Sequence, residues 1–197
     1  MADNQVTKFG VSGINHLALV CKDMKVTVDF YENVLGFPLI KTLDLPYGSG
    51  QHFFFDIGGG DSLAFFWFPE APDSQPGITH PAHGFGRGSM TTAHATMNHV
   101  AFNIDADRIE ECQQRLVDAG VEITPVINHD HSETQASLEL TDTTFVRSIY
   151  FQDPDGIMLE FAGWTRPMTP EDVAHEPATH ADRERYLALQ KQLVPGQ

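Results

Sequence analysis

Residues 13–20, Gly-Ile-Asn-His-Leu-Ala-Leu-Val, decide the fold because residues 96–103, Thr-Met-Asn-His-Val-Ala-Phe-Asn, repeat their pattern. Both segments alternate and are rich in β-prone side chains, so each predicts a strand. An acidic start and a helical run follow each segment, over residues 23–35 and 105–119. Gly36 and Gly120 then stand where a left-handed glycine ends a helix. The chain therefore begins each half with a strand and a helix.

Strand-like stretches follow each helix. They cover residues 37–45, 51–57 and 62–68 in the first copy, and 121–128, a broken stretch near 137–140 running on to 146–152, and 157–163 in the second. The turn sequence Asp-Pro-Asp-Gly at 153–156 joins the last two, and Gly-Gly-Gly at 58–60 is the matching corner. Each half is thus βαβββ. The sequence predicts an α+β fold in which two tandem modules form one curved mixed sheet around a central metal cleft, with helices outside.

The same pattern sets the expected organisation of the chain. It predicts an N-terminal arm (1–12), a first module (13–69), an inter-module loop rich in Pro, Gly and His (70–95), a second module (96–164) and a C-terminal helical tail (165–197). In the tail, Thr169 and Pro170 favour a helix start, and residues 181–193 favour a charged surface helix. A packing or dimerisation role suits such a tail better than a catalytic one.

Composition excludes several classes of function. The 197 residues carry 27 acidic and 12 basic side chains, a net charge of −15 that repels nucleic acids and anionic membranes. No apolar run approaches the ~20 residues of a membrane span. The first residues have neither a basic start nor an apolar stretch, so no secretory signal is expected. Two cysteines are too few for a disulfide framework. We therefore expect a soluble, cytoplasmic, acidic globular protein.

Three side chains predict a metal site. His16 and His99 occupy equivalent positions on equivalent strands, so a pseudo-twofold axis is expected to bring them together. Glu160 lies on the final strand, four residues after Gly156. Two imidazoles and a carboxylate on one face of an ion leave open positions, an arrangement suited to Fe(II) and also to Mn(II). In the first copy Ala64 stands where Glu160 stands in the second, and alanine cannot bind a metal.

The paired Asn-His strands and residues 150–160, Tyr-Phe-Gln-Asp-Pro-Asp-Gly-Ile-Met-Leu-Glu, resemble the vicinal oxygen chelate superfamily over residues 11–163. That superfamily includes glyoxalases, extradiol dioxygenases, and fosfomycin- and bleomycin-resistance proteins. The resemblance implies metal ligands at His16, His99 and Glu160. Ala64 departs from the four-ligand pattern of glyoxalases and methylmalonyl-CoA epimerases. This departure favours the dioxygenases and the fosfomycin-resistance transferases.

Further candidates surround the metal. The resemblance implies that Tyr150 points at the substrate and donates to a metal-bound oxygen, although a packing role fits it equally well. His52 shares its strand parity with Phe54, so it is expected to face the cleft as an acid or base. His83, sixteen residues before His99, lies close to where dioxygenases carry their acid/base histidine. We therefore predict catalytic roles for Tyr150, His52 and His83.

Other residues bear on the choice of chemistry. Thr141 replaces another active-site histidine of the dioxygenases, which weakens the ring-cleavage hypothesis. His129 is expected to lie solvated on a loop. Arg147 is the one basic residue near the cleft strands, so too few positive charges are expected there to bind a doubly charged phosphonate.

Three functions remain open on the sequence. The first is Fe(II)-dependent, dioxygenase-like oxidoreductase chemistry on a small diol, catechol or enol. The alternative is a Mn-, Ni- or Zn-dependent glyoxalase-like lyase, isomerase or thiol transferase, including the fosfomycin-resistance type. The third is a metal-free binding protein of the bleomycin-resistance type. A homodimer is expected, because members of the superfamily commonly dimerise.

Overall fold

A computed structural model describes residues 8–83 and 89–193, so most of the predicted N-terminal arm lies outside the described residues. The chain divides into two compact units, residues 1–165 and 166–197. Both modules belong to the first unit. No helix among the described residues is long and apolar enough to cross a membrane.

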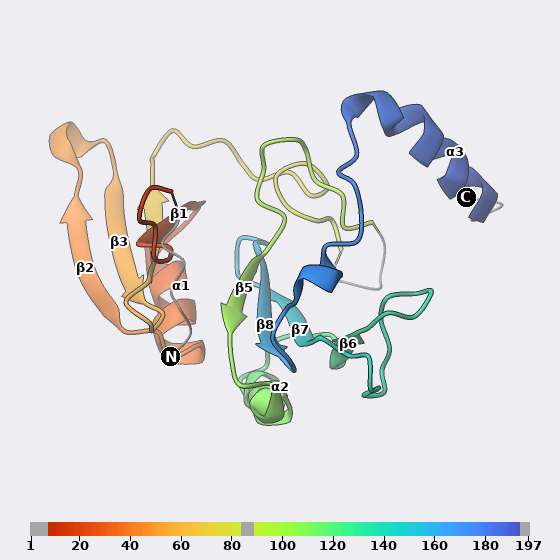
Figure 1. Ribbon diagram of the computed structural model, residues 1–197. Helices are drawn as coiled ribbons and strands as arrows, with labels where there is room; N and C mark the ends of the chain where they lie inside the picture. Colours follow the sequence, from red (N-terminus) through yellow and green to blue (C-terminus); the bar gives the residue numbers. More distant parts are fainter. Residues whose placement is uncertain (1–7, 84–88, 194–197) are drawn as a thin grey trace. The chain divides into compact units, whose positions relative to one another are not determined.

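The first module follows the predicted order of elements (Figure 1). These are β1 (His16–Cys21), α1 (Met24–Val28), η1 (Asp29–Val34), β2 (Leu39–Asp44), η2 (Pro46–Gly48), β3 (Gln51–Asp56) and β4 (Ser62–Trp67). The sheet order is β1-β4-β3-β2, with β1 parallel to β4 and the other pairs antiparallel. Asp23 caps α1 through hydrogen bonds that its carboxylate accepts from the amides of Lys25 and Val26.

The second module repeats this topology. Its elements are β5 (Val100–Asn103), η3 (Ala106–Arg108), α2 (Ile109–Asp118), β6 (Ile127–His129), β7 (Val146–Gln152) and β8 (Met158–Trp164), in the order β5-β8-β7-β6. The predicted α+β fold with two βαβββ modules is therefore confirmed. The strand predicted over 121–128 is shorter than expected, because Pro125 has no amide hydrogen to donate to a ladder. The stretch near 137–140 contributes only a single bridge, between Ser137 and Asn128.

The strands form two separate four-stranded sheets, not the one continuous sheet that the repeat predicts. Among the described residues, no ladder joins the two sheets. Side chains join the modules instead. The Tyr31 hydroxyl donates to Asp153 Oδ2 at 3.1 Å, and the rings of Phe37 and Phe102 meet edge-to-face at 5.0 Å. Side-chain contacts thus hold the two modules together in place of the shared ladder that was expected.

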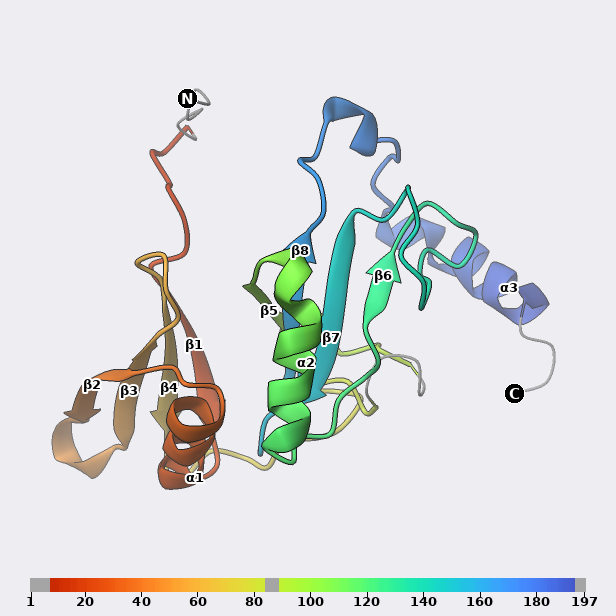
Figure 2. The ribbon, with the colours of Figure 1, turned by 90° about the horizontal axis from the view of Figure 1, so that it is seen from below.

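Each sheet has one face toward its helix and one face away from it. In Figure 2, α2 lies along the second sheet, where Ile109 and Leu116 are buried. Because side chains alternate along a strand, Phe151 and Leu159 point to the helix side and Glu160 to the other side. The face away from the helix is called the cleft face below, in both modules. The candidate site residues lie on these two cleft faces.

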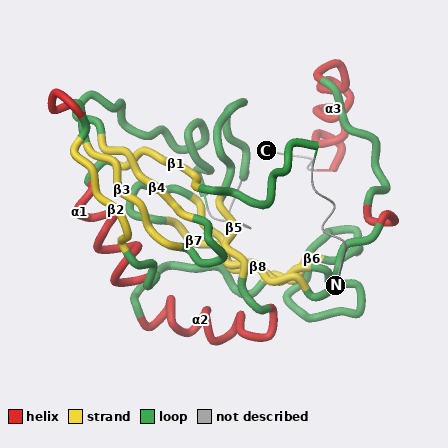
Figure 3. Tube along the Cα trace, turned by 60° about the vertical axis from the view of Figure 1, so that its left-hand side comes forward, coloured by secondary structure: helices red, strands yellow, loops and turns green. Residues whose placement is uncertain are grey.

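The described parts of the long connection between β4 and β5, residues 68–83 and 89–99, are drawn as loop in Figure 3. In the second unit, η4 (Pro170–Asp172) begins with a capping box at Thr169, η5 (His180–Asp182) follows, and α3 (Arg183–Leu193) agrees with the predicted helix over 181–193.

Candidate metal centre

The centre of the candidate site is a contact between His99 and Glu160. His99 immediately precedes β5, and Glu160 lies in β8, which runs parallel beside β5. Their Nε2 and Oε2 atoms are 3.1 Å apart, and the Glu160 side chain is only 6% exposed. Two ligands held about 2.1 Å from one ion at a right angle lie about 3.0 Å apart. The pair therefore has the spacing of two neighbouring ligands of a divalent ion.

Asn98 sets the direction in which His99 presents its nitrogens. His99 Nδ1 lies 2.9 Å from Asn98 Oδ1, and a carbonyl oxygen only accepts, so Nδ1 donates its hydrogen. In neutral imidazole this leaves a lone pair on Nε2, the atom that faces Glu160. Two acceptors at this distance need a cation between them, either a proton or a metal ion. The donor set thus fits a divalent metal, with Asn98 orienting one ligand.

Glu160 is held as a carboxylate although it is buried. Burial alone would raise the pKa of Glu160. The hydrogen bond with His99 and the contacts with Ser148 and Tyr150 lower it by more than burial raises it, so the pKa lies below its ordinary value. An ionised, desolvated carboxylate is a strong ligand for a hard cation.

Tyr150 borders the pair on β7, directly opposite Glu160 in the ladder. Its ring meets the His99 ring edge-to-face at 5.9 Å. Burial, and next to it the negative charge of Glu160, raise the pKa of the phenol. The phenol of Tyr150 is therefore held in its protonated form beside Glu160.

Ser148 adds a buried hydroxyl to the same cleft face, two residues before Tyr150. The residue is fully buried, and its Oγ has no hydrogen-bond partner of normal geometry among the described residues. Its polar neighbours on this face are Glu160 and Tyr150, and contact with Ser148 lowers the pKa of both groups.

His16 and His52 form a second group on the cleft face of the first module. His16 repeats the local geometry of His99, since its Nδ1 lies 2.8 Å from Asn15 Oδ1. It is exposed, and its ring meets Phe54 at 5.5 Å. His52 stacks on Phe66 at 3.6 Å, and its Nε2 is buried with no hydrogen-bond partner among the described residues. Burial, followed by the nearby His16, lowers the pKa of His52 and favours a neutral imidazole.

One chain does not bring the predicted ligands together. Among the described residues, no three His, Cys, Asp or Glu side chains are grouped to hold a metal. The expectation that His16 meets His99 and Glu160 is therefore not met within the chain. The physical reason is the division into two sheets: His16 belongs to the cleft face of the first module, and the other two belong to the second.

His83 and His129 both lie near Tyr150. His83 lines a pocket of about 290 Å³ together with Tyr150 and Met158. His129 was expected to be solvated, but it ends β6 with its Nε2 3.2 Å from the Tyr150 hydroxyl. In the sequence, the alternation of Ile127 and His129 is typical of a strand. Pro125, two residues before Ile127, interrupts that pattern and made the strand hard to predict.

Arg147 is excluded from the cleft face. It lies between Val146 and Ser148 on β7 and so points to the helix side. There it bonds Glu110, the side chain of Asn128 and the carbonyl of Ala106. The cation that the sequence placed near the cleft is already engaged in holding α2 and η3 to the sheet.

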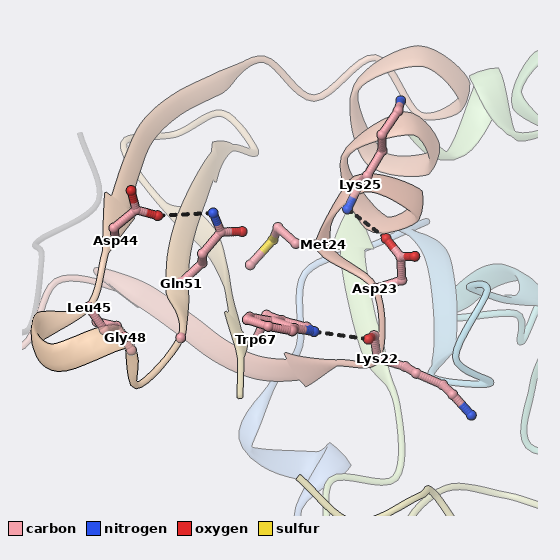
Figure 4. Close-up of a pocket in the computed structure, with 10 residues that line it drawn as sticks. Lys22, Asp23, Met24, Lys25, Asp44, Leu45, Gly48, Gln51 and Trp67 are labelled. Atoms are coloured by element: carbon pink, nitrogen blue, oxygen red, sulfur yellow. Dashed lines mark hydrogen bonds between the residues drawn. The ribbon is translucent and has the colours of Figure 1, made fainter. Parts of the chain in front are cut away.

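A second pocket, of about 820 Å³, opens beside the first module (Figure 4). Its lining includes Trp67, whose indole donates to the Lys22 carbonyl, and the hydrogen-bonded pair Asp44 and Gln51. The Lys22 ammonium is paired with Asp73 in an exposed salt bridge. None of the ten lining residues is a histidine, so this pocket offers no comparable chemistry.

The repeat and the two cleft faces define a protein of two βαβββ modules, and the His99–Glu160 pair is its candidate metal site. The chain belongs to the Glyoxalase/Bleomycin resistance protein/Dioxygenase superfamily, whose family model matches residues 13–161. The resemblance to the vicinal oxygen chelate superfamily is thereby confirmed.

The chain is also similar to individual proteins of this superfamily. The chain is 29% identical over 172 residues to the metallothiol transferase FosB of Shouchella clausii, with 87% of this chain and 92% of the relative covered. It is 25% identical over 163 residues to the fosfomycin resistance protein FosX of Listeria monocytogenes, with 79% and 92% covered. Among solved structures, a glyoxalase family protein from Enterococcus faecalis is similar at a TM-score of 0.54, with 22% identity and 76% and 96% of the chains covered. That likeness supports the fold.

Proposed function

We propose that the protein is a divalent-metal enzyme of the thiol-transferase kind, which adds a nucleophile to a small electrophile bound through its oxygens. The observation that carries this proposal is the His99–Glu160 pair, with two acceptor atoms 3.1 Å apart on rigid strands. When bound, the metal supplies Lewis-acid polarisation of a substrate oxygen. Similarity to a protein named metallothiol transferase supports this interpretation over oxygen chemistry.

The dioxygenase hypothesis stays an unconfirmed prediction, as does Fe(II) as the metal. Both FosB and FosX relatives favour the alternative that the sequence left open. Thr141 further supports that choice, since its hydroxyl bonds Asp130 and its neighbours and offers no imidazole.

The complete site is proposed to form between two subunits. His99 and Glu160 supply two ligands, and the third is His16 of the partner subunit. His16 and His99 share the same asparagine contact at Nδ1, so both present Nε2 outward in the same way. The exposed cleft face around His16 is then covered in a homodimer with two equal sites.

The remaining candidates have distinct proposed roles. Tyr150, kept protonated beside Glu160, donates a hydrogen bond to a substrate oxygen as negative charge develops there. The neutral imidazole of His52 accepts the proton of the incoming thiol or water. His83 lines the same pocket as Tyr150 and is proposed to contact the substrate there.

Charge limits the substrate. Arg147 is engaged behind the sheet, and the chain carries a net charge of −15. Lys41, opposite Phe54 in the ladder, is the cation on the cleft strands of the first module. One exposed lysine balances a phosphonate dianion poorly, so we propose an uncharged or singly charged epoxide or activated carbonyl.

The test uses protein loaded with Mn²⁺ and a panel of small epoxides and α-ketoaldehydes, with L-cysteine or glutathione as the thiol. Metal-dependent loss of free thiol, absent in His99→Ala, is the expected result. Fosfomycin is included as the phosphonate and is expected to react more slowly than uncharged epoxides. Oxygen uptake with catechols in Fe(II)-loaded protein, without thiol consumption by the Mn²⁺ form, would contradict the proposal.

A further inference from the structure

A chain of hydrogen bonds leads from the end of β6 to the proposed metal pair. His129 Nε2 lies 3.2 Å from the Tyr150 hydroxyl oxygen. Tyr150 also lies directly opposite Glu160 in the β7–β8 ladder, and the neighbouring carboxylate raises the pKa of the phenol. His129 is not one of the proposed metal ligands. It therefore acts on the proposed site through its contact with Tyr150.

The direction of these bonds follows from the hydrogens available. A carboxylate only accepts, so in a hydrogen bond between these two neighbours the Tyr150 hydroxyl is the donor. A phenol has one such hydrogen, and it is used in that bond. The Tyr150 oxygen must therefore accept in its contact with His129, which requires a hydrogen on Nε2 of His129. With a metal bound, the corresponding nitrogen of His99 would present a lone pair to the ion, so the two histidines would then need opposite tautomers.

Backbone hydrogen bonds hold the chain in place on both sides of the His129 side chain. Its carbonyl accepts the amide of Phe145 at 2.9 Å, which extends the β6–β7 pairing by one residue. The next residue, Asp130, is 3% exposed and accepts the amide of Ser132 at 2.9 Å. A side chain on a paired strand end followed by a closed turn positions its ring nitrogen well.

We propose that His129 is a positioning residue, which donates from Nε2 to Tyr150 and so directs the phenolic hydrogen toward Glu160 and the substrate oxygen. This inference rests on the proposed function for its consequence in catalysis. Its structural content, the tautomer of His129 and the direction of the bond, holds in the metal-free protein.

The replacements His129→Gln and His129→Asn make a matched pair. The glutamine amide reaches the place of Nε2 and still donates, whereas the shorter asparagine amide does not reach it. His129→Ala removes the donor entirely. Tyr150→Phe assigns the Tyr150 resonance among the four tyrosines of the chain.

The decisive experiment is NMR on metal-free protein labelled with ¹⁵N-histidine and ¹³Cζ-tyrosine, at pH 8, above the ordinary imidazole pKa of about 6.5. We expect a protonated Nε2 in His129. We also expect the Tyr150 ¹³Cζ resonance to move in His129→Ala and His129→Asn but not in His129→Gln. An unprotonated Nε2, or a Tyr150 resonance that is the same in all variants, would overturn the proposal.

Activity then separates positioning from general damage. We expect His129→Ala to lower kcat for metal-dependent thiol consumption by about tenfold, with Mn²⁺ affinity within about twofold of wild type. In a Tyr150→Phe background the same replacement is expected to have no further effect. Additive losses would overturn the positioning role. A wild-type protein that consumes no thiol would contradict the proposed function alone, because the NMR result is independent of it.

Discussion

The two modules share a strand order and an Asn-His pair, but their cleft faces differ at one matched position. Ala18 pairs with Ala64 in the first module, and Ala101 pairs with Glu160 in the second. The first residue of each pair, Ala18 or Ala101, lies two residues after the histidine of its own module. The second module therefore has a histidine and a carboxylate in contact, and the first has a histidine facing aromatic rings. The two modules therefore contribute unequally to the proposed site, with two candidate ligands on the second module and one on the first.

Converting the second module into a copy of the first is expected to have the largest effect. Glu160→Ala removes the ionised ligand and leaves His99 without its partner. Mn²⁺ affinity is expected to fall by more than the roughly 10–100-fold typical of losing an outer hydrogen-bond partner. Titration calorimetry checks this, with His175→Ala as a control in the second compact unit. Retained stoichiometric binding in Glu160→Ala would show that the ion is held elsewhere.

The reverse conversion, Ala64→Glu, places a carboxylate on the first module. Ala64 is fully buried, so a charge there is expected to lower the free energy of unfolding by about 3 kcal/mol in metal-free protein. If His16 is a ligand, the new carboxylate lies near the ion, and Mn²⁺ should raise Tm more in this variant than in wild type. Chemical denaturation and thermal melts with and without Mn²⁺ measure both effects. An equal Mn²⁺ response in the two proteins would separate the first module from the metal.

The corners of the two modules differ in charge. Burial raises the pKa of Asp153 to about 6, with Asp155 adding to the effect, whereas the glycine corner of the first module carries no such group. Unfolded Asp ionises near a pH of about 3.9, so between these values the folded state binds the extra proton. Stability from this group is full below a pH of about 3.9 and is lost as pH rises through about 6, by up to about 3 kcal/mol.

Asp153→Asn keeps an acceptor for the amides of Asp155 and Ile157 and removes the titration. The stability of wild type relative to this variant should therefore fall between about pH 4 and about pH 6.5. Urea denaturation across that range gives the difference. A flat difference would mean that Asp153 is ionised throughout in the folded protein.

The asparagines test whether the two histidines are equivalent. Asn15→Ala and Asn98→Ala each remove the contact at Nδ1, at 2.8 and 2.9 Å. Both are expected to weaken Mn²⁺ binding by roughly 10–100-fold. Calorimetric titrations of the two variants side by side decide the point. A loss confined to Asn98→Ala would remove His16 from the ligand set.

The glycine corners give the smallest expected effect. Gly60 has φ +89°, and a Cβ added there would meet nothing within 4 Å, so Gly60→Ala should cost only the backbone strain of about 1 kcal/mol. Gly156 has φ +88°, and a Cβ there would meet His80 Nε2 at 2.7 Å. Gly156→Ala should therefore cost more than Gly60→Ala in denaturant unfolding. Equal losses would show that the His80 ring moves aside freely.

Much of this architecture was predictable because it follows from local rules and from the repeat. The order of elements along the chain and the equivalence of Ala64 with Glu160 follow from alternation and spacing, and the ladders place these two residues at matched positions. The tautomer-setting contacts of Asn15 and Asn98 were not predicted, since they depend on side-chain rotamers. Neither was the place of His129, because a short strand after Pro125 has too little pattern to detect.

The separation of His16 from His99 could not be predicted from the sequence either. A repeat predicts that two halves are alike, but it does not say whether they meet within one chain or between two. That choice depends on apolar packing between modules, such as Phe37 against Phe102, which no spacing encodes.

Subunit complementation tests the central claim most directly, that one metal site joins the cleft faces of two chains. His16→Ala and His99→Ala proteins are each expected to bind no Mn²⁺ tightly. After they are mixed, unfolded and refolded together, half of the dimers should be mixed, each with one intact site, so about a quarter of the wild-type sites should return. A mixture that binds no more Mn²⁺ than its components would contradict the account.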